Sequence, residues 1–205
     1  MVARINKPII NTSNEEVYLS LLGYWIKEES LNQTANHGGQ HFPNAVYINN
    51  YKPYDKPDIQ CGVIINIDNT NYNGKSIGQR EATTEYNIDC FYRMNVTADD
   101  VNDFDSKAIT RLQRLTHNVR NILSSTYYNN MLGDKNVKDS KITNITYFQP
   151  EKENVGEIVV SRMNFKMEYF EINVDGISQA LESINSSLKF GENNEILIVN
   201  NTEDN

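Results

Sequence analysis

The sequence predicts an α+β fold in which an antiparallel sheet of about four or five strands packs against helices, with long polar loops and a C-terminal arm. Three observations lead to this fold class. Some segments carry an apolar residue at every second position, others carry apolar residues at helical spacing, and long polar or proline-rich stretches separate them. The chain of 205 residues is 39% apolar, which suffices for one domain over residues 1–190, with residues 191–205 as a tail or arm.

Residues 84–123 hold the clearest strand and the clearest helix. Alternate positions from Tyr86 to Val96 are apolar, while the positions between them are mostly polar apart from Phe91. Such a strand meets a core on one side and solvent on the other, as in an antiparallel sheet. From Phe104 the apolar positions take helical spacing, and acidic residues precede the helix, where its dipole favours them. This segment therefore predicts a strand that packs onto a helix.

Further elements are predicted before this unit. A capped helix is expected over residues 14–31, a proline- and glycine-rich extended segment over 37–58, and a strand over 59–69. Residues 69–84 form a polar stretch that is too long for a tight turn. A projecting β-hairpin or a mobile loop fits this stretch best.

The last third of the chain predicts paired strands and a final helix. Two strand candidates cover residues 141–149 and 156–174, and a change of apolar parity inside the second predicts a β-bulge. A helix is expected over residues 177–190. The apolar run 196–199 in the acidic tail is either an added strand or an arm that binds a partner.

Composition argues against several classes of protein. The net charge of −8, with 19 basic against 27 acidic residues, argues against a general affinity for nucleic acid phosphates. The N-terminal stretch lacks the apolar core of a signal peptide, and no apolar run approaches the roughly 20 residues of a membrane helix. We therefore expect a soluble protein that is made in the cytosol and has no membrane partner. Cys61 and Cys90 fall on apolar strand faces and predict buried, reduced thiols.

No pattern of residues predicts a catalytic, metal or cofactor site. His37 and His41 have a spacing that would suit a metal on a helix, but the glycines between them remove that helix. Asp68, Glu85 and Asp89 could form the carboxylate cluster of a metal-dependent nuclease, although solvent-facing carboxylates on a polar sheet face are the simpler interpretation. We therefore expect a protein that is not an enzyme, with the nuclease as the alternative from another class. Three long connections and 12 tyrosines favour assembly with other proteins.

The order of the predicted elements carries a family resemblance. It runs over residues 14–174 through the helix "VYLSLLGYWI", the lead-in "YKPYDKPDI", the strand "CGVIINI", a polar loop, the strand "TEYNIDCFYRMNV", an acidic turn, the helix "AITRLQRLTHNVRNIL" and paired strands. This order resembles the tail terminator, or tail completion, proteins of tailed bacteriophages. The resemblance is one of order and pattern, because no single motif is diagnostic of that family.

The resemblance implies a virion structural protein of the tail or neck, assembled in the host cytoplasm. Its subunits would form a ring, typically a hexamer, that caps the tail tube at its head-proximal end and joins it to the head connector or stopper protein, with the sheath protein as a further partner. DNA would only pass through the lumen, which fits an acidic chain. Another head-to-tail connector or a baseplate ring protein is the alternative within this class.

The polar stretch 69–84 and the C-terminal run are the candidate assembly contacts. An unpaired strand or a surface loop with aromatic and basic side chains is suited to binding a neighbour. The candidate residues are Tyr72, Lys75, Arg80, Ile196, Leu197, Ile198 and Val199.

Overall fold

In the computed structural model of the chain, the described residues are 13–39, 41–49, 59–76, 79–93, 104–125, 135–148, 158–171 and 195–197. Within them, only the backbone is described for 74–76, 79–80, 104–106 and 195–197. Two helices and six strands lie in these ranges, in the order α1 (Asn14–His37), β1 (Ala45–Ile48), β2 (Cys61–Ser76), β3 (Gln79–Arg93), α2 (Phe104–Ser124), β4 (Val137–Phe148), β5 (Ile158–Phe170) and β6 (Glu195–Leu197).

The strands form one sheet in the order β4-β5-β3-β2-β1-β6. Neighbouring strands are antiparallel except for β1, which runs parallel to β2. This largely antiparallel sheet with two helices confirms the predicted α+β class. The strand β1 lies in the segment that the sequence predicts as extended and irregular. All four of its residues are buried, so it shows none of the alternation by which strands are recognised.

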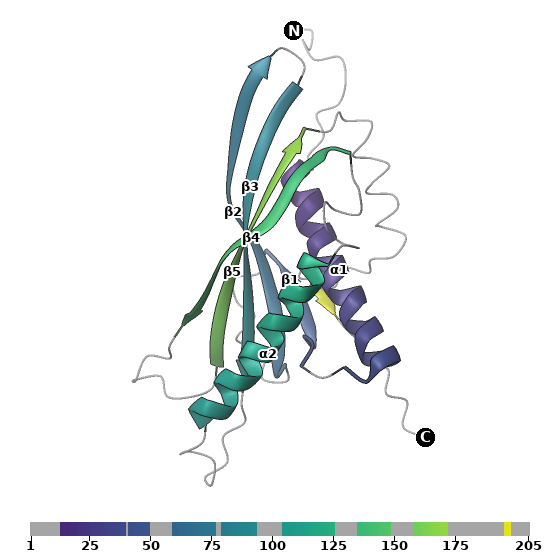
Figure 1. Ribbon diagram of the computed structural model, residues 1–205, viewed down its shortest axis with the longest axis vertical. Coiled ribbons are helices and arrows are strands. Elements are labelled where there is room, and N and C mark those ends of the chain that lie inside the picture. The colour runs from purple at the N-terminus through teal and green to yellow at the C-terminus, as the bar shows by residue number, and fades with distance from the viewer. Residues whose placement is uncertain are drawn as a thin grey trace, which may run out of the picture.

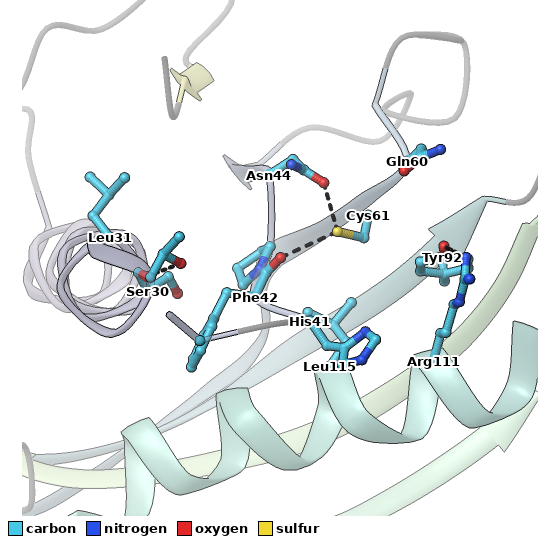
Figure 2. A pocket seen from close by; sticks show the side chains of 13 residues that line it. Ser30, Leu31, His41, Phe42, Asn44, Gln60, Cys61, Tyr92, Arg111 and Leu115 are labelled. Carbon is cyan, nitrogen blue, oxygen red and sulfur yellow. Dashed lines mark hydrogen bonds between the residues drawn. The ribbon is translucent and has the colours of Figure 1, made fainter. Parts of the chain in front are cut away.

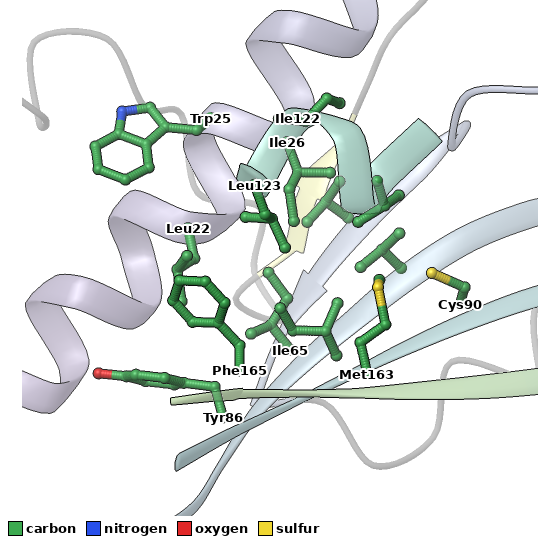
Figure 3. Packing of buried hydrophobic residues seen from close by; sticks show 14 of the residues in the cluster. Leu22, Trp25, Ile26, Ile65, Tyr86, Cys90, Ile122, Leu123, Met163 and Phe165 are labelled. Atoms are coloured by element: carbon green, nitrogen blue, oxygen red, sulfur yellow. The ribbon is translucent and has the colours of Figure 1, made fainter. Parts of the chain in front are cut away.

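Both helices pack on the same face of the sheet, and the main core lies between them and the strands (Figures 1 and 3). The strand and helix predicted within residues 84–123 lie at the centre of this core. Ile88 and Cys90 of β3 and Leu112 and Leu115 of α2 are all buried there. Full burial of an aliphatic side chain of this size contributes about 2 kcal/mol, so the matching apolar faces hold the strand and helix together.

The opposite face of the sheet is mostly polar and carries a second, smaller apolar cluster. Ala45, Tyr47, Ile64 and Phe91 are the buried residues of this cluster. Phe91 is the apolar residue that interrupts the polar side of β3, and the pleat directs it to this face. Gly62 lies beneath its ring, where a Cβ would come within 2.6 Å of the Phe91 Cζ atom. A glycine at this position therefore lets the ring lie flat on the sheet.

The strands β2 and β3 form a long hairpin that projects beyond the helices (Figure 1). Their pairing runs from Cys61 opposite Tyr92 to Ser76 opposite Gln79, with a register shift between Ile67 and Asn69. The polar stretch 69–84 is thus a continuation of two strands. Of the two structures that the sequence allows there, the projecting hairpin is the one that forms.

The ends of α1 follow local signals in the sequence. The Ser13 side chain accepts a hydrogen bond from the Glu16 amide at 3.4 Å, and the Glu16 carboxylate accepts one from the Ser13 amide at 3.0 Å. This reciprocal pair is a capping box. The helix ends at His37 because Gly38 takes a left-handed conformation with φ of 60°, which costs a glycine little.

Several sequence predictions fall outside the described residues. These are the helix over 177–190, the apolar positions 94–96, the contacts Ile198 and Val199, and the side chains of Lys75 and Arg80. Within its described range, β5 alternates between buried and half-buried residues, and positions 172 and 174, on which the predicted bulge depends, also lie outside the described residues. The pairing of β4 with β5 shows register shifts between Val137 and Asp139 and between Ile142 and Asn144.

Candidate interaction surfaces

The projecting hairpin is fixed to the first turn of α1. The Tyr72 phenol donates a hydrogen bond to the Glu15 carboxylate, and the Tyr86 phenol donates one to the Glu15 carbonyl at 3.2 Å. Burial alone would raise the pKa of the Glu15 carboxyl, but hydrogen bonds, first of all that from Tyr72, outweigh burial and lower this pKa. The same hydrogen bond, together with burial, raises the pKa of Tyr72 to about 12. Glu15 is therefore a buried carboxylate that the hairpin stabilises.

Hydroxyl groups extend this contact across the sheet. Thr84 of β3 lies 3.0 Å from the Thr70 hydroxyl of β2 and 2.9 Å from the Tyr169 hydroxyl of β5. The Tyr169 ring packs on Tyr18 of α1, with the ring centroids 4.8 Å apart. Burial raises the pKa of Tyr169 far above its ordinary value, so its phenol remains a hydrogen-bond donor at neutral pH. These hydroxyl groups and the ring contact join β2, β3, β5 and α1 at the point where the hairpin leaves the core.

The structure separates the two sets of predicted contact residues. Tyr72, which is 56% exposed, lies on the hairpin, with the backbones of Lys75 and Arg80 beyond it near the tip. Arg80 is opposite Gly74, and Lys75 lies in the register shift between Gly74 and Ser76. Ile196 and Leu197 lie in β6, which pairs with β1 of the same chain. Ala45 of β1 pairs with Leu197 of β6 on one side and with Gly62 of β2 on the other. Gly62 precedes Tyr72 by ten residues along β2, so Leu197 and Tyr72 are roughly 30 Å apart along the strand direction. The two sets thus belong to different ends of the sheet.

The carboxylates that the nuclease interpretation invokes lie on the polar face of the sheet, and amide or guanidinium groups bind each of them. Both oxygens of Asp89 accept hydrogen bonds from Arg162, at 2.7 and 2.8 Å. Asp68 accepts from Asn87 at 2.8 Å, and Glu85 accepts from the Asn69 amide at 3.3 Å. Among the described residues, no three His, Cys, Asp or Glu side chains are grouped as metal ligands would be. These carboxylates are arranged as hydrogen-bonded groups on the surface of the sheet and not as a set of metal ligands.

His37 and His41, whose spacing would suit a metal on a helix, do not share a helix in the structure. His37 ends α1, whereas His41 follows the two glycines with φ of 64°, and its Nε2 lies 3.2 Å from the Arg114 guanidinium. Burial, Arg114 and Arg111 lower the pKa of His41, so it is neutral at physiological pH. The cationic groups beside His41 make this part of the surface positive.

A cavity of about 290 Å³ lies where the end of α1, Gly39 and residues 41–44 meet β2, β3 and α2 (Figure 2). Cys61 lines it, with its Sγ 2.7 Å from the Asn44 Oδ1 and 3.3 Å from the Phe42 carbonyl. Across the cavity, the Arg111 guanidinium donates to the Tyr92 hydroxyl at 2.6 Å. Burial raises the pKa of Cys61, so the thiol is protonated and a poor nucleophile. No local pattern predicts this cavity, because its lining comes from segments far apart in the sequence.

Cys61 and Cys90 are both buried and free, which confirms the prediction of reduced thiols. Cys90 lies deeper, in the main core, and burial raises its pKa to about 12. Hydroxyls of Thr116 and Ser161, 2.6 Å apart, also lie in this part of the core. Both thiols therefore act as small apolar side chains.

From Lys107 to Ser124, the exposed ionisable side chains of α2 are all basic. Lys107, Arg111 and Arg114 follow one another at spacings of four and three residues and are all exposed. Such spacing places them on one line along the helix, here called the cationic stripe. No acidic residue occurs between Lys107 and Ser125. The sequence shows these cations outside the apolar stripe of the helix, but it gives no reason to select them as contacts.

Comparison with protein-family models and with curated proteins gave no match to this chain. Among the helices of the described ranges, none has the length and apolar character to cross a membrane.

Proposed function

We propose that this protein is a virion structural protein that forms a ring at the head-proximal end of a phage tail, caps the tail tube and joins it to the head connector. The α+β class and the order of elements over residues 14–174 agree with the resemblance to tail terminator proteins. The ring is a hexamer, and its partners are the tail tube protein, the head connector or stopper protein and the sheath protein. The protein is a component of the virion.

The projecting hairpin is the observation that carries this proposal. The strand β3 pairs with β5 as far as Glu81, and beyond that residue β2 and β3 continue as a two-stranded ribbon, a structure that is only marginally stable in water when isolated. Tyr72, close to this end, ties the hairpin to α1 through Glu15. A ribbon of this kind supplies backbone groups and side chains to a neighbouring subunit or to the tube. Its function in the proposed ring is to bind the next protein in the stack.

The charge balance supports a passage for DNA. A net charge of −8 repels phosphate groups, so DNA can move through a lumen of such subunits without sticking to its wall. The proposal therefore treats DNA as cargo and assigns it no binding site.

A shortened hairpin tests the proposal. Deletion of residues 75–81 leaves Asn73 and Gly74 as a two-residue turn between Tyr72 and Ala82, which already face each other. Asn-Gly is a favoured sequence for such turns, and the Tyr72 hydrogen bond to Glu15 is retained. The fold should survive, which circular dichroism and a melting curve can verify.

The assay is the capping of tail tubes, viewed by electron microscopy after the protein is mixed with assembled tubes of the phage that encodes it. The full chain should bind at one end of each tube and stop its elongation, whereas the shortened chain should not. A full chain that leaves the tubes bare, or that binds along their sides, would contradict the proposal. Magnesium-dependent cleavage of DNA that depends on Asp68 and Glu85 would favour the nuclease instead.

A further inference from the structure

The charges of this protein are distributed unevenly between α2 and the rest of the chain. The helix α2 carries four basic residues and one acidic residue, a charge of +3. Since the whole chain carries −8, the remaining residues carry −11. A helix with an excess of positive charge thus lies on the surface of a strongly acidic chain.

His41 lies beside the cationic stripe, with its Nε2 3.2 Å from the Arg114 guanidinium. Burial first, and then the charges of Arg114 and Arg111, lower the pKa of His41. Exposed Tyr147 lies near the stripe, because a surface hollow is lined by Arg114, His117 and Tyr147 together. Arginine and tyrosine side chains are enriched in protein interfaces, so this surface has the composition of a binding surface.

The polar face of the sheet, on the other side from α2, carries two carboxylates, Asp68 and Glu85, that form no ion pair within the described residues. Asp68 and Glu85 accept hydrogen bonds only from asparagine amides within the described residues. Lys166 lies opposite Glu85 in the sheet, but its ammonium group binds Glu168 at 2.9 Å. The other carboxylates of this face have cations, as Asp89 has Arg162 and Glu81 has Lys138. Within the described residues, Asp68 and Glu85 are therefore carboxylates of this face that form no ion pair.

We propose that the cationic stripe of one copy of this chain binds the Asp68 and Glu85 face of the sheet in a second copy. The inference rests on the proposed ring and specifies its subunit interface. The stripe and the carboxylates lie on opposite sides of one sheet, so the two binding surfaces of a subunit face away from each other. A contact between different surfaces of identical subunits is heterologous, and it propagates from copy to copy until a ring closes.

Charge variants test this interface on the full chain. Arg114→Glu reverses a charge in the stripe. Arg120→Glu makes the same change on the same helix, about 120° around the axis from Arg114, and serves as the matched control. Arg120 is exposed, and no ion pair within the described residues involves it. The sheet variant combines Asp68→Asn with Glu85→Gln, which removes two charges while the new amide oxygens still accept the asparagine hydrogen bonds.

Sedimentation velocity over a range of protein concentrations gives the self-association constant of each variant. The wild-type chain should assemble at low salt and dissociate as salt rises, because screening weakens exposed ion pairs. Arg114→Glu and the sheet variant should each raise the concentration needed for assembly by about tenfold or more, whereas Arg120→Glu should leave it within about twofold. Melting temperatures close to that of the wild type establish that the variants are folded.

Mixing the two interface variants provides the decisive observation. Each variant keeps one intact surface, so an equimolar mixture should form dimers at concentrations at which each variant alone is monomeric. Assembly that is insensitive to Arg114→Glu, or a wild-type chain that is monomeric at low salt, would overturn the interface. So would a result in which Arg114→Glu abolishes binding of double-stranded DNA and leaves assembly unchanged. Capping of tail tubes is scored separately, so a failure of this interface is distinguishable from a failure of the proposed function.

Discussion

Tyr72 and Glu15 lie 57 positions apart in the chain, and a hydrogen bond from the phenol to the carboxylate joins the projecting hairpin to the start of α1. Glu15 is only 7% exposed, so the carboxylate depends on this donor and on the groups of the helix start. The bond connects the part of the molecule that the proposal assigns to binding with the part that forms the core.

Removal of the phenol hydroxyl measures the strength of this connection. Tyr72→Phe keeps the ring and deletes the donor, and we expect it to lower the free energy of unfolding by about 1 kcal/mol, since Tyr72 is half exposed and water can replace the donor. Urea unfolding gives the value. Tyr147→Phe is the control, because Tyr147 is similarly exposed and no described group binds its hydroxyl; it should change stability by less than about 0.5 kcal/mol. Equal losses in the two variants would contradict the account.

The pH dependence of the same pair follows from its pKa shifts. The folded-state pKa of Glu15 lies below the ordinary 4.5, so its contribution to stability is present above 4.5 and is lost as the pH falls through the lowered pKa. The folded-state pKa of Tyr72 lies at about 12 instead of 10.0, so its contribution is present below pH 10 and is lost as the pH rises toward 12. The stability difference between wild type and Tyr72→Phe should therefore be constant near neutral pH and shrink at both extremes. A difference that grows in acid would exclude a charged Glu15 as the acceptor.

The ion pair of Asp89 and Arg162 stabilises the polar face through one buried partner. The Asp89 side chain is 8% exposed and the Arg162 side chain 40%. Arg162→Gln leaves the carboxylate buried without its cation, and we expect a loss of about 2 kcal/mol, reduced from the value for a fully buried pair because Arg162 is partly solvated. Asp89→Asn in addition should recover part of that loss, because a neutral amide needs no cation. Urea unfolding gives the free energies of unfolding of the single and double variants. If the loss in the double variant equals the sum of the losses in the two single variants, the ion pair does not couple Asp89 to Arg162 and the prediction is wrong.

The two thiols should react at different rates. Cys90 is fully enclosed and its pKa is about 12, whereas Cys61 is 8% exposed and lines a cavity. In the native protein we expect slow labelling by a disulfide reagent, Cys61 before Cys90, and rapid labelling of both in denaturant. Cys61→Ala should remove the faster native phase. Rapid labelling of both thiols under native conditions would contradict the buried positions of the strands that carry them.

The sequence predicts the elements that repeat a pattern over many residues. The alternation from Tyr86 to Tyr92 and the helical stripe from Ala108 to Ile122 both identify side chains of the main core. The capping box at Ser13 and the glycines after His37 define the ends of α1 for local reasons. In these places the physical signal is contained within the segment itself.

Other features depend on contacts between distant segments and leave no local signal. The strand β1 is buried on both sides and is too short to show a period of two. Its parallel pairing with β2 requires a crossover connection, which no local sequence pattern predicts. The contact of Tyr72 with Glu15 and the cavity at Cys61 arise only when the hairpin and helices pack. The basic residues of α2 are visible in the sequence, but their place opposite the carboxylate face follows from the sheet topology.

We propose that copies of this chain form a closed ring that caps a tail tube. Multi-angle light scattering of the purified protein, alone and after addition of assembled tail tubes, measures the mass of this assembly. We expect a species of roughly six times the mass of the 23.5 kDa chain, with that species recovered on the tubes. A protein that stays monomeric alone and remains free when tubes are present would contradict it.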